Sequence, residues 1–261
     1  MCRSLVDPTP LSCIFRAKLL LLQCNLTQFV CSFFQSIEMG ADTLLVDEDT
    51  CATNFMIRDD KMMQLVAKEK EPITPFVNIV RSLYDDHRIS SIMVIGGVGD
   101  YFAVADNVIV MDCYKCIDKT ERAKEIVANS TSSQINSETK TFRAIRPRFV
   151  VPDRFSTNGK VKVLSKSTIS YGETELDIAF VEQVIAKAQT TAISNSLQSL
   201  HRVTNPNQSL KEALHALDWH MDRDGLDVLA PGKLDGAMFR PRRFEIGSAM
   251  NRLRLLKSLH Q

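Results

Sequence analysis

The stretch DTLLVDEDTCATN, residues 42–54, decides the fold of this chain. Its apolar run TLLV leads directly into Asp47, Glu48 and Asp49. A short, continuous apolar run is typical of a strand that is buried on both faces of a parallel sheet. Three adjacent carboxylates repel one another. The end of this strand is therefore expected to face a positive charge, and a metal ion is the first candidate.

The sequence that follows this strand predicts an α/β fold. Apolar residues recur at helical spacing in two segments, and two further apolar runs are typical of buried strands. Pro72 and Pro75 separate the two helical segments. A strand, a helix, a second strand and a short connection to a third indicate a mostly parallel sheet. The helices are expected at 55–70 and 76–88, and the strands at 90–97 and 106–114.

The second half of the chain has a different organisation. Residues 120–140 become polar and rich in Ser, Thr and Asn, which predicts a linker or loop. We expect an α+β region from residue 141, in which Ser209 and Glu212 form a capping box and Pro241 opens the last helix. Its predicted elements are a hairpin at 161–172 and helices at 176–201, 209–221 and 241–259.

Composition excludes several classes of protein. The 261 residues are 44% hydrophobic and carry a net charge of +1, which is ordinary for one large domain or two small ones. A net charge so close to zero argues against a nucleic-acid-binding field over the whole protein, although local patches remain possible. The most apolar stretch, residues 19–34, is interrupted by Gln23, Asn25 and Gln28, so we predict no transmembrane helix.

The cysteines and the N-terminal segment bear on the compartment. Seven scattered cysteines, an odd number, do not resemble a disulfide framework and favour a reducing compartment. We therefore predict a cytoplasmic protein. Residues 1–36, however, carry Arg3, Arg16 and Lys18 against Asp7 alone, with several Ser and Thr residues. This pattern leaves a mitochondrial or other organelle location as the alternative, although an N-terminal extension without a targeting role is the favoured explanation.

A buried strand that ends in Asp-Glu has a specific use in nucleoside triphosphatases. The first acid holds Mg²⁺ and the second polarises the attacking water. The strand end places both at the carboxyl edge of the sheet, where ligands bind in α/β proteins. Asp47 and Glu48 have this spacing. The alternative is an acidic turn through which a strand simply leaves the core and meets solvent.

Longer motifs resolve this choice. The segments DEDTCATNFMIRD, EKEPITPF, GGVGDYFAVAD and PRRFEIGSAMNRLR occur in this order along the chain. Together with EQVIAKAQTTAI, they resemble the predicted ATPases of the ABC class, a family of P-loop ATPases that are not transporters. The resemblance covers about residues 37–261. It implies ATP as ligand, Mg²⁺ as cofactor, and a homodimer that closes across the nucleotide.

The resemblance also assigns roles to individual residues. Asp47 would bind Mg²⁺, and Glu48 would be the catalytic residue that orients the hydrolytic water. A first group would line the nucleotide or the dimer face: Asp49, Thr50, Thr53 and Asn54. A second group would form a switch turn near the γ-phosphate: Gly96, Gly97, Gly99 and Asp100. Within that turn, Val98 stands where a small polar residue is expected.

One half of such a site is missing from the sequence. A P-loop needs the sequence G-x-x-x-x-G-K-[ST] to bind the phosphates. The first glycine of this chain is Gly40, so residues 1–46 do not contain that sequence. The glycine-containing ABC signature is absent as well. We therefore predict a partial ABC-type sheet that lacks the phosphate-loop strand, and a chain that is inactive by itself. The predicted divisions are a divergent extension at 1–36, an ATPase core fragment at 37–140 and a family-specific region at 141–261.

The alternative is that the chain is a non-catalytic fragment that binds another macromolecule, either a protein or a nucleic acid. Arginines in the stretch FRPRRFEIGSAMNRLRLLK, residues 239–257, suit an RNA contact through Arg240, Arg242 and Arg243. The favoured explanation, however, is that basic residues near a helix C-terminus interact with the helix dipole. The pair in CYKC, residues 113–116, has the spacing of a zinc knuckle, but zinc needs four ligands and no second pair is present. We predict no zinc site there.

Overall fold

The computed structural model divides the chain into two compact units. Unit 1 comprises Met1–Phe34 and Ala41–Ala144, and unit 2 comprises Gln35–Gly40 and Ile145–Gln261. The structure describes residues 19–22, 26–51, 53–57, 74–130, 142, 145–156, 160–205, 207–232, 235–253 and 258–260. None of the helices within these ranges is long and apolar enough to cross a membrane.

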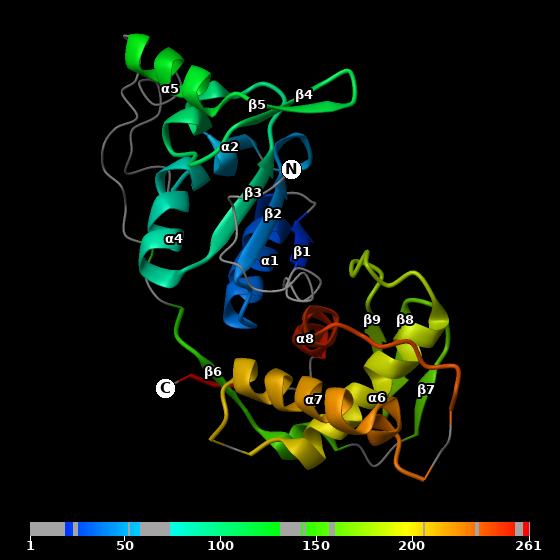
Figure 1. Cartoon of the computed structure of the whole chain (residues 1–261). Helices are drawn as coiled ribbons and strands as arrows, with labels where there is room; N and C mark the ends of the chain where they lie inside the picture. The colour runs from blue at the N-terminus through cyan, green and yellow to red at the C-terminus, as the bar shows by residue number, and fades with distance from the viewer. Residues whose placement is uncertain are drawn as a thin grey trace. The chain divides into compact units, whose positions relative to one another are not determined.

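Unit 1 is built on a three-stranded parallel sheet in the order β1-β2-β3 (Figure 1). Its strands are β1 (Leu19–Leu22), β2 (Thr43–Asp47) and β3 (Ser90–Val94). The strand predicted at 43–47 is confirmed, and Leu44 and Val46 are buried as its apolar run requires. β1 lies within the segment predicted to be a divergent extension, yet it pairs with β2 from Leu19 opposite Thr43 onward.

The strand predicted at 90–97 is shorter and less buried than expected. β3 ends at Val94, and Ile92 and Val94 are 60% and 67% exposed. Among the described strands β3 pairs only with β2, so it lies at the edge of this sheet. Exposed and half-buried residues alternate along β3, so one of its faces is left uncovered, whereas the apolar run predicted a strand covered on both faces.

The helices of unit 1 pack around a cluster of phenylalanines. The centroid of the Phe33 ring lies 5.7 Å from that of Phe55, 5.7 Å from that of Phe76 and 6.0 Å from that of Phe142. The elements are α1 (Leu26–Glu38), α2 (Thr53–Met56), a 3-10 helix (Phe76–Asn78), α4 (Val80–His87) and α5 (Thr120–Asn129). The helix predicted at 76–88 is confirmed, whereas most of the one predicted at 55–70 lies outside the described residues. The linker predicted at 120–140 begins instead with a helix, α5.

The third strand predicted for the parallel sheet belongs to a hairpin. β4 (Ile109–Asp112) pairs antiparallel with β5 (Lys115–Asp118) in a separate two-stranded sheet. The two residues between them, Cys113 and Tyr114, have φ angles of 46° and 63°. Positive φ at both positions is the geometry of the tight turn that reverses a chain in two residues. The expectation of a parallel partner was therefore wrong.

Unit 2 combines small sheets with three helices. The hairpin predicted at 161–172 is confirmed as β7 (Val161–Val163) and β8 (Thr168–Tyr171), and β9 (Thr174–Asp177) extends it. β6 (Arg148–Val150) pairs antiparallel with β10 (Ser258–His260), and a 3-10 helix covers Pro152–Phe155. The buried Tyr171 hydroxyl donates to the Phe155 carbonyl oxygen at 2.6 Å, which joins the hairpin to that 3-10 helix.

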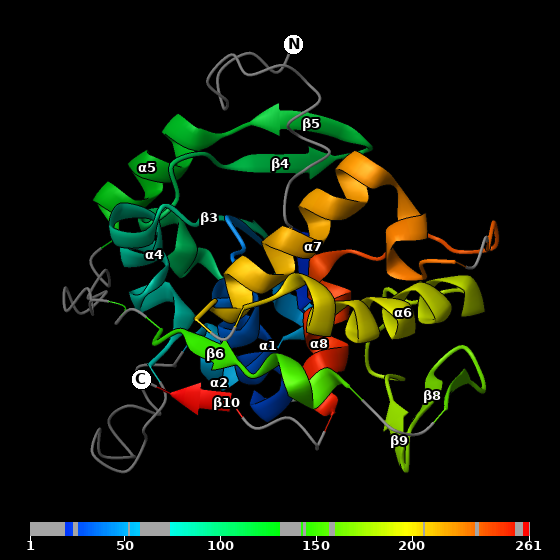
Figure 2. The same ribbon diagram turned by 90° about the horizontal axis from the view of Figure 1, so that it is seen from below.

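The helices of unit 2 are α6 (Lys187–Val203), α7 (Leu210–Asp224) and α8 (Arg243–Arg252), with a 3-10 helix at Leu226–Leu229. They pack against one another (Figure 2). The predicted capping box of Ser209 and Glu212 opens α7. Two predicted boundaries were wrong. α6 begins at Lys187 rather than 176, because the preceding residues turn to bury Ile178, Val181 and Val184. α8 begins after Pro241 and ends at Arg252, and strand β10 follows.

Candidate functional site

The acidic residues of the predicted site lie where β2 ends. Asp47 is the last residue of the strand, and Glu48–Thr50 form a single 3-10 turn. The Thr50 hydroxyl donates to the Asp47 carbonyl oxygen at 3.1 Å, and the Cys51 amide donates to the Glu48 carbonyl oxygen at 3.1 Å. These two bonds hold the chain in a tight turn, so the three carboxylates remain together at the carboxyl edge of the sheet.

The structure brings the predicted switch turn against these acids. The Gly96 amide donates to Glu48 Oε2, with 3.3 Å between the nitrogen and the oxygen. A Cβ atom on Gly96 would lie 3.2 Å from Asp49 Oδ2, which is tighter than most real contacts. A side chain at residue 96 would therefore require the exposed Asp49 carboxylate to shift by a few tenths of an ångström. This contact joins two segments that are 48 residues apart in the sequence.

The other predicted residues are less constrained. A Cβ atom on Gly97 would meet no atom within 4 Å, and one on Gly99 would make only ordinary contact with Phe102. Asp100 and Thr53 are exposed, at the starts of the 3-10 helix Gly99–Ala103 and of α2. The side chain of Asn54 lies outside the described residues. The geometry thus gives a packing reason for glycine at position 96 alone.

Tyr101 is a residue of this site that the sequence did not single out. It is 2% exposed, and its hydroxyl donates to the Met56 carbonyl oxygen at 2.6 Å. Burial raises the pKa of this phenol above its ordinary value, and the negative charge of Glu48 adds to the increase. Tyr101 therefore fastens the switch turn to the short helix that follows the acids. The GDY motif contained this tyrosine, but its packing role could be seen only in the structure.

Cys51 gives the acidic turn a buried anchor. Its side chain is 8% exposed. Burial raises the pKa of the thiol to about 12, and the neighbouring Asp47 carboxylate contributes to the shift. The thiol is therefore protonated at physiological pH, and it packs as a small apolar group rather than acting as a nucleophile.

The donor set of the turn suits a hard cation only in part. Carboxylate oxygens are preferred ligands of Mg²⁺, which typically uses one or two of them together with substrate phosphates. Within the described ranges no three His, Cys, Asp or Glu residues converge in a way that could hold a metal ion without further help. The same part of the structure shows no ion pair to Asp47, Glu48 or Asp49. The turn therefore fits a Mg²⁺ ion that is shared with another ligand.

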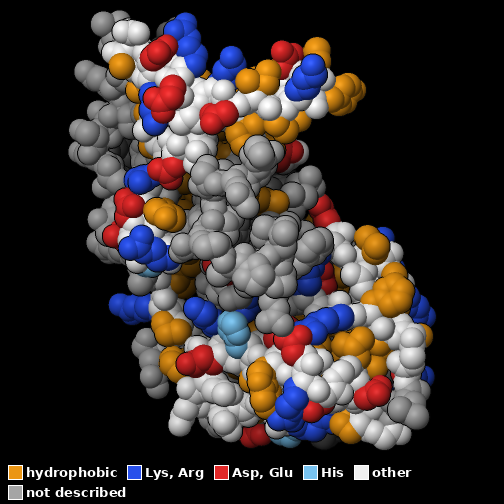
Figure 3. Space-filling view, in the orientation of Figure 1, with side chains coloured by type: hydrophobic (Ala, Val, Ile, Leu, Met, Phe, Trp, Pro, Cys, Tyr) orange, Lys and Arg blue, Asp and Glu red, His pale blue; other side chains and the backbone are white. Residues whose placement is uncertain are grey.

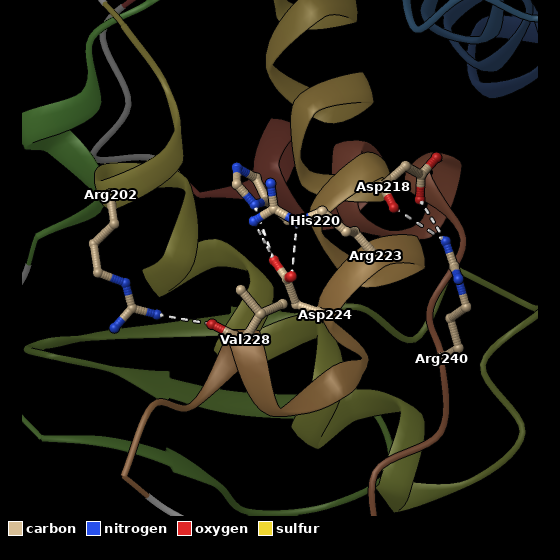
Figure 4. Close-up of polar contacts among 7 residues, drawn as sticks. All are labelled: Arg202, Asp218, His220, Arg223, Asp224, Val228 and Arg240. Atoms are coloured by element: carbon tan, nitrogen blue, oxygen red, sulfur yellow. Dashed lines mark hydrogen bonds and ion pairs between the residues drawn. The ribbon is translucent and has the colours of Figure 1, made fainter.

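The three arginines predicted to contact RNA have partners within unit 2. Arg240 reaches Asp222 Oδ1 at 2.7 Å. It also reaches Asp218 Oδ1 at 3.6 Å (Figure 4). Arg242 forms an ion pair with Glu245, with 2.8 Å between Nε and Oε1. Arg243 is 5% exposed, and its guanidinium lies 2.6 Å from the His215 ring. These contacts offset or bury the charges that an RNA patch would present.

Two family models match the chain. Residues 27–148 match ABC_ATPase, described as a P-loop domain, and residues 160–258 match the MRB1590 C-terminal domain. A comparison with curated proteins found no match. The first match begins ten residues before the start that the sequence motifs indicated at residue 37, so it includes all of α1 except its first residue, Leu26. The family predicted from the motifs is confirmed by this match of residues 27–148 to an ABC-class P-loop domain.

Proposed function

We propose that unit 1 is the acidic half of an ABC-class nucleotide site, in which Asp47 binds Mg²⁺ and Glu48 orients water for ATP hydrolysis. Mg²⁺ would neutralise charge on the phosphates and polarise them for attack. The observation that carries this proposal is the Gly96 amide bond to Glu48 Oε2 at 3.3 Å. Because the Gly96 turn follows the neighbouring strand and contacts Glu48 directly, a phosphate bound at this turn would change the position of the Glu48 carboxylate.

The proposal extends to the other residues of the site. Asp49, Thr50, Thr53 and Asn54 would face the nucleotide or a second protomer, and the Gly96–Asp100 turn would sense the γ-phosphate. A homodimer would complete the site, as it does in the family that the motifs resemble. The carboxylates of the turn lie on the surface of the strand end, where a partner or a phosphate can reach them.

We propose further that this chain does not hydrolyse ATP by itself. Nowhere in the 261 residues is there a Gly-Lys-Ser or Gly-Lys-Thr sequence with which a phosphate loop could end. Charge-assisted hydrogen bonds contribute about 1.5–3 kcal/mol each. Losing three would cost about 5–9 kcal/mol, and micromolar binding amounts to only about 8 kcal/mol. ATP binding should therefore be millimolar or weaker.

Two measurements test these statements separately. Isothermal titration of the 261-residue chain with Mg²⁺ and ATP should show no micromolar affinity, and micromolar binding would contradict the proposed inactivity. Mn²⁺, used as a paramagnetic probe for Mg²⁺, should bind weakly and lose affinity in Asp47→Asn. The matched control is Asp42→Asn, at the opposite end of β2. Equal loss of Mn²⁺ binding in both variants would remove Asp47 from the metal site.

RNA binding through Arg240, Arg242 and Arg243 stays a prediction, as a second function that the match to the MRB1590 C-terminal domain leaves open. The ion pairs of Arg240 and Arg242 argue that these arginines mainly stabilise unit 2. Filter binding of a single-stranded RNA at several salt concentrations tests this in Arg240→Ala/Arg242→Ala. Unchanged affinity and salt dependence would exclude the RNA contact, whereas a lower salt slope would support it.

A further inference from the structure

Three sulfur-containing side chains lie at the tip of the β4–β5 hairpin, outside the acidic turn. Met111 on β4 is opposite Cys116 on β5 in the strand register, and Cys113 opens the turn between the strands. The Cys116 thiol lies 3.2 Å from the Met111 sulfur. Met111 is 65% exposed, and both cysteines are free and exposed. Figure 1 shows the hairpin, and Figure 3 shows hydrophobic side chains, coloured orange, on the surface in the same region of the view.

The turn itself is unusual in sequence. Two-residue turns with positive φ at both positions favour Asn-Gly, because side chains with a branched or bulky Cβ are strained there. This chain places Cys113 and Tyr114 at those positions, with φ of 46° and 63°. The Tyr114 side chain is 102% exposed, so packing does not explain its presence in the turn. The hairpin therefore exposes its sulfur groups to solvent although two non-glycine residues, Cys113 and Tyr114, adopt unfavourable positive φ angles in its turn.

Sulfur ligands of this kind select soft metal ions. Thiolates and thioethers favour Cu(I), whereas the carboxylates of the acidic turn favour Mg²⁺. A structural zinc site needs four ligands, and the described residues supply no suitable group of three or more His, Cys, Asp or Glu. Cu(I) carries a lower charge than Zn²⁺ and accepts two or three soft ligands, so two thiolates and one thioether are sufficient for it.

We propose that Met111, Cys113 and Cys116 form a binding site for Cu(I). The two cysteines bind as thiolates and release their protons, and the Met111 thioether is the third, weaker ligand. The strand register already holds two of the three sulfurs in contact, so little chain entropy is lost on binding. The site concerns the hairpin alone and does not depend on the proposed nucleotide site.

The test is a Cu(I) titration of the full chain under anaerobic, reducing conditions, in competition with bathocuproine disulfonate. Cys2, Cys13, Cys24 and Cys31 are replaced by Ser in every protein, so that only three thiols remain. This parent should take up one equivalent of Cu(I). Cys113→Ser/Cys116→Ser should lose it, and Met111→Leu should bind about tenfold more weakly. Cys51→Ser, whose thiol is buried, is the matched control and should retain it.

Misfolding and adventitious binding are distinguished in the same experiment. The far-ultraviolet circular dichroism of Cys113→Ser/Cys116→Ser and of Met111→Leu should equal that of the parent, because the side chains substituted in these two variants are exposed. The graded effect of Met111→Leu leaves both thiols in place and so reports the site itself. Equal affinity in the parent and in Cys113→Ser/Cys116→Ser would overturn the proposal. So would a parent that holds Cu(I) no more tightly than glutathione does at the same thiol concentration.

Discussion

Removing the Arg148 side chain should destabilise unit 2 strongly. Arg148 makes a two-pronged ion pair with Glu38, in which Nε reaches Oε1 and Nη2 reaches Oε2, each at 2.6 Å. Nη2 also donates to Asn251 Oδ1 at 2.9 Å. The side chain of Glu38 is only 9% exposed and that of Arg148 is 25% exposed. This network joins the end of α1, strand β6 and helix α8.

The magnitude follows from what Arg148→Ala leaves behind. Removing one partner of a buried ion pair costs about 3–5 kcal/mol, because the other charge stays buried without compensation. Arg148 is partly exposed, so the lower limit of about 3 kcal/mol applies. With an m-value of about 2 kcal/mol per molar urea, the unfolding midpoint should fall by about 1.5 M.

Urea unfolding followed by tryptophan fluorescence measures this change in unit 2 alone. The chain has a single tryptophan, Trp219, which lies in α7. Arg146→Ala is the matched control, since Arg146 is exposed in the same segment and should change the midpoint little. Glu38→Met/Arg148→Met should recover most of the stability, because both charges leave the interior together. A shift below about 0.5 M for Arg148→Ala would refute the reasoning.

Three further predictions concern packing, reactivity and the edge strand. Gly247→Ala should cost about 1–3 kcal/mol of the unfolding free energy of unit 2, measured by Trp219 fluorescence, because a Cβ there would overlap the Met39 sulfur. Cys51 should react with maleimide only slowly at pH 8, and its rate should keep increasing as the pH approaches the raised pKa of the thiol, about 12. Because the folded state keeps this thiol protonated, unit 1 should also lose stability as the pH rises from 9.0 toward about 12. Labelling is measured by residue-resolved mass spectrometry, and rapid labelling of Cys51 at pH 8 would contradict the prediction. Ile92→Thr/Val94→Thr should reduce aggregation, measured by light scattering, and change the melting temperature little, because both side chains are more than half exposed.

The sequence predicted elements whose signals are local. The run TLLV correctly predicted β2, because a strand that is buried on both faces needs a continuous apolar stretch. Ser209 and Glu212 indicated the start of α7 because their spacing satisfies the free amides of a helix N-terminus. β4 was misassigned because its apolar run is the same in a buried parallel strand and in an exposed hairpin. The residues of its turn, Cys113 and Tyr114, lack the glycine by which such turns are usually recognised.

Contacts between segments that are distant along the chain could not be predicted from the sequence. Arg148 and Glu38 are 110 residues apart, and neither residue by itself indicates a buried ion pair. At the candidate site, the motifs supplied Glu48 and Gly96 as members of one family pattern. Only the structure shows that the Gly96 amide donates directly to Glu48 and that the Tyr101 hydroxyl donates to the Met56 carbonyl oxygen.

The acidic turn connects the stability of unit 1 with its proposed function. Asp47, Glu48 and Asp49 repel one another, and the Gly96 amide is a neutral donor that offsets only part of this repulsion. A ligand that binds the folded turn and not the unfolded chain adds stability in proportion to the logarithm of its concentration over its dissociation constant. Mg²⁺ together with a phosphate-bearing partner should therefore raise the melting temperature of unit 1. ATP without a divalent cation should not, since its negative charge adds to that of the three carboxylates.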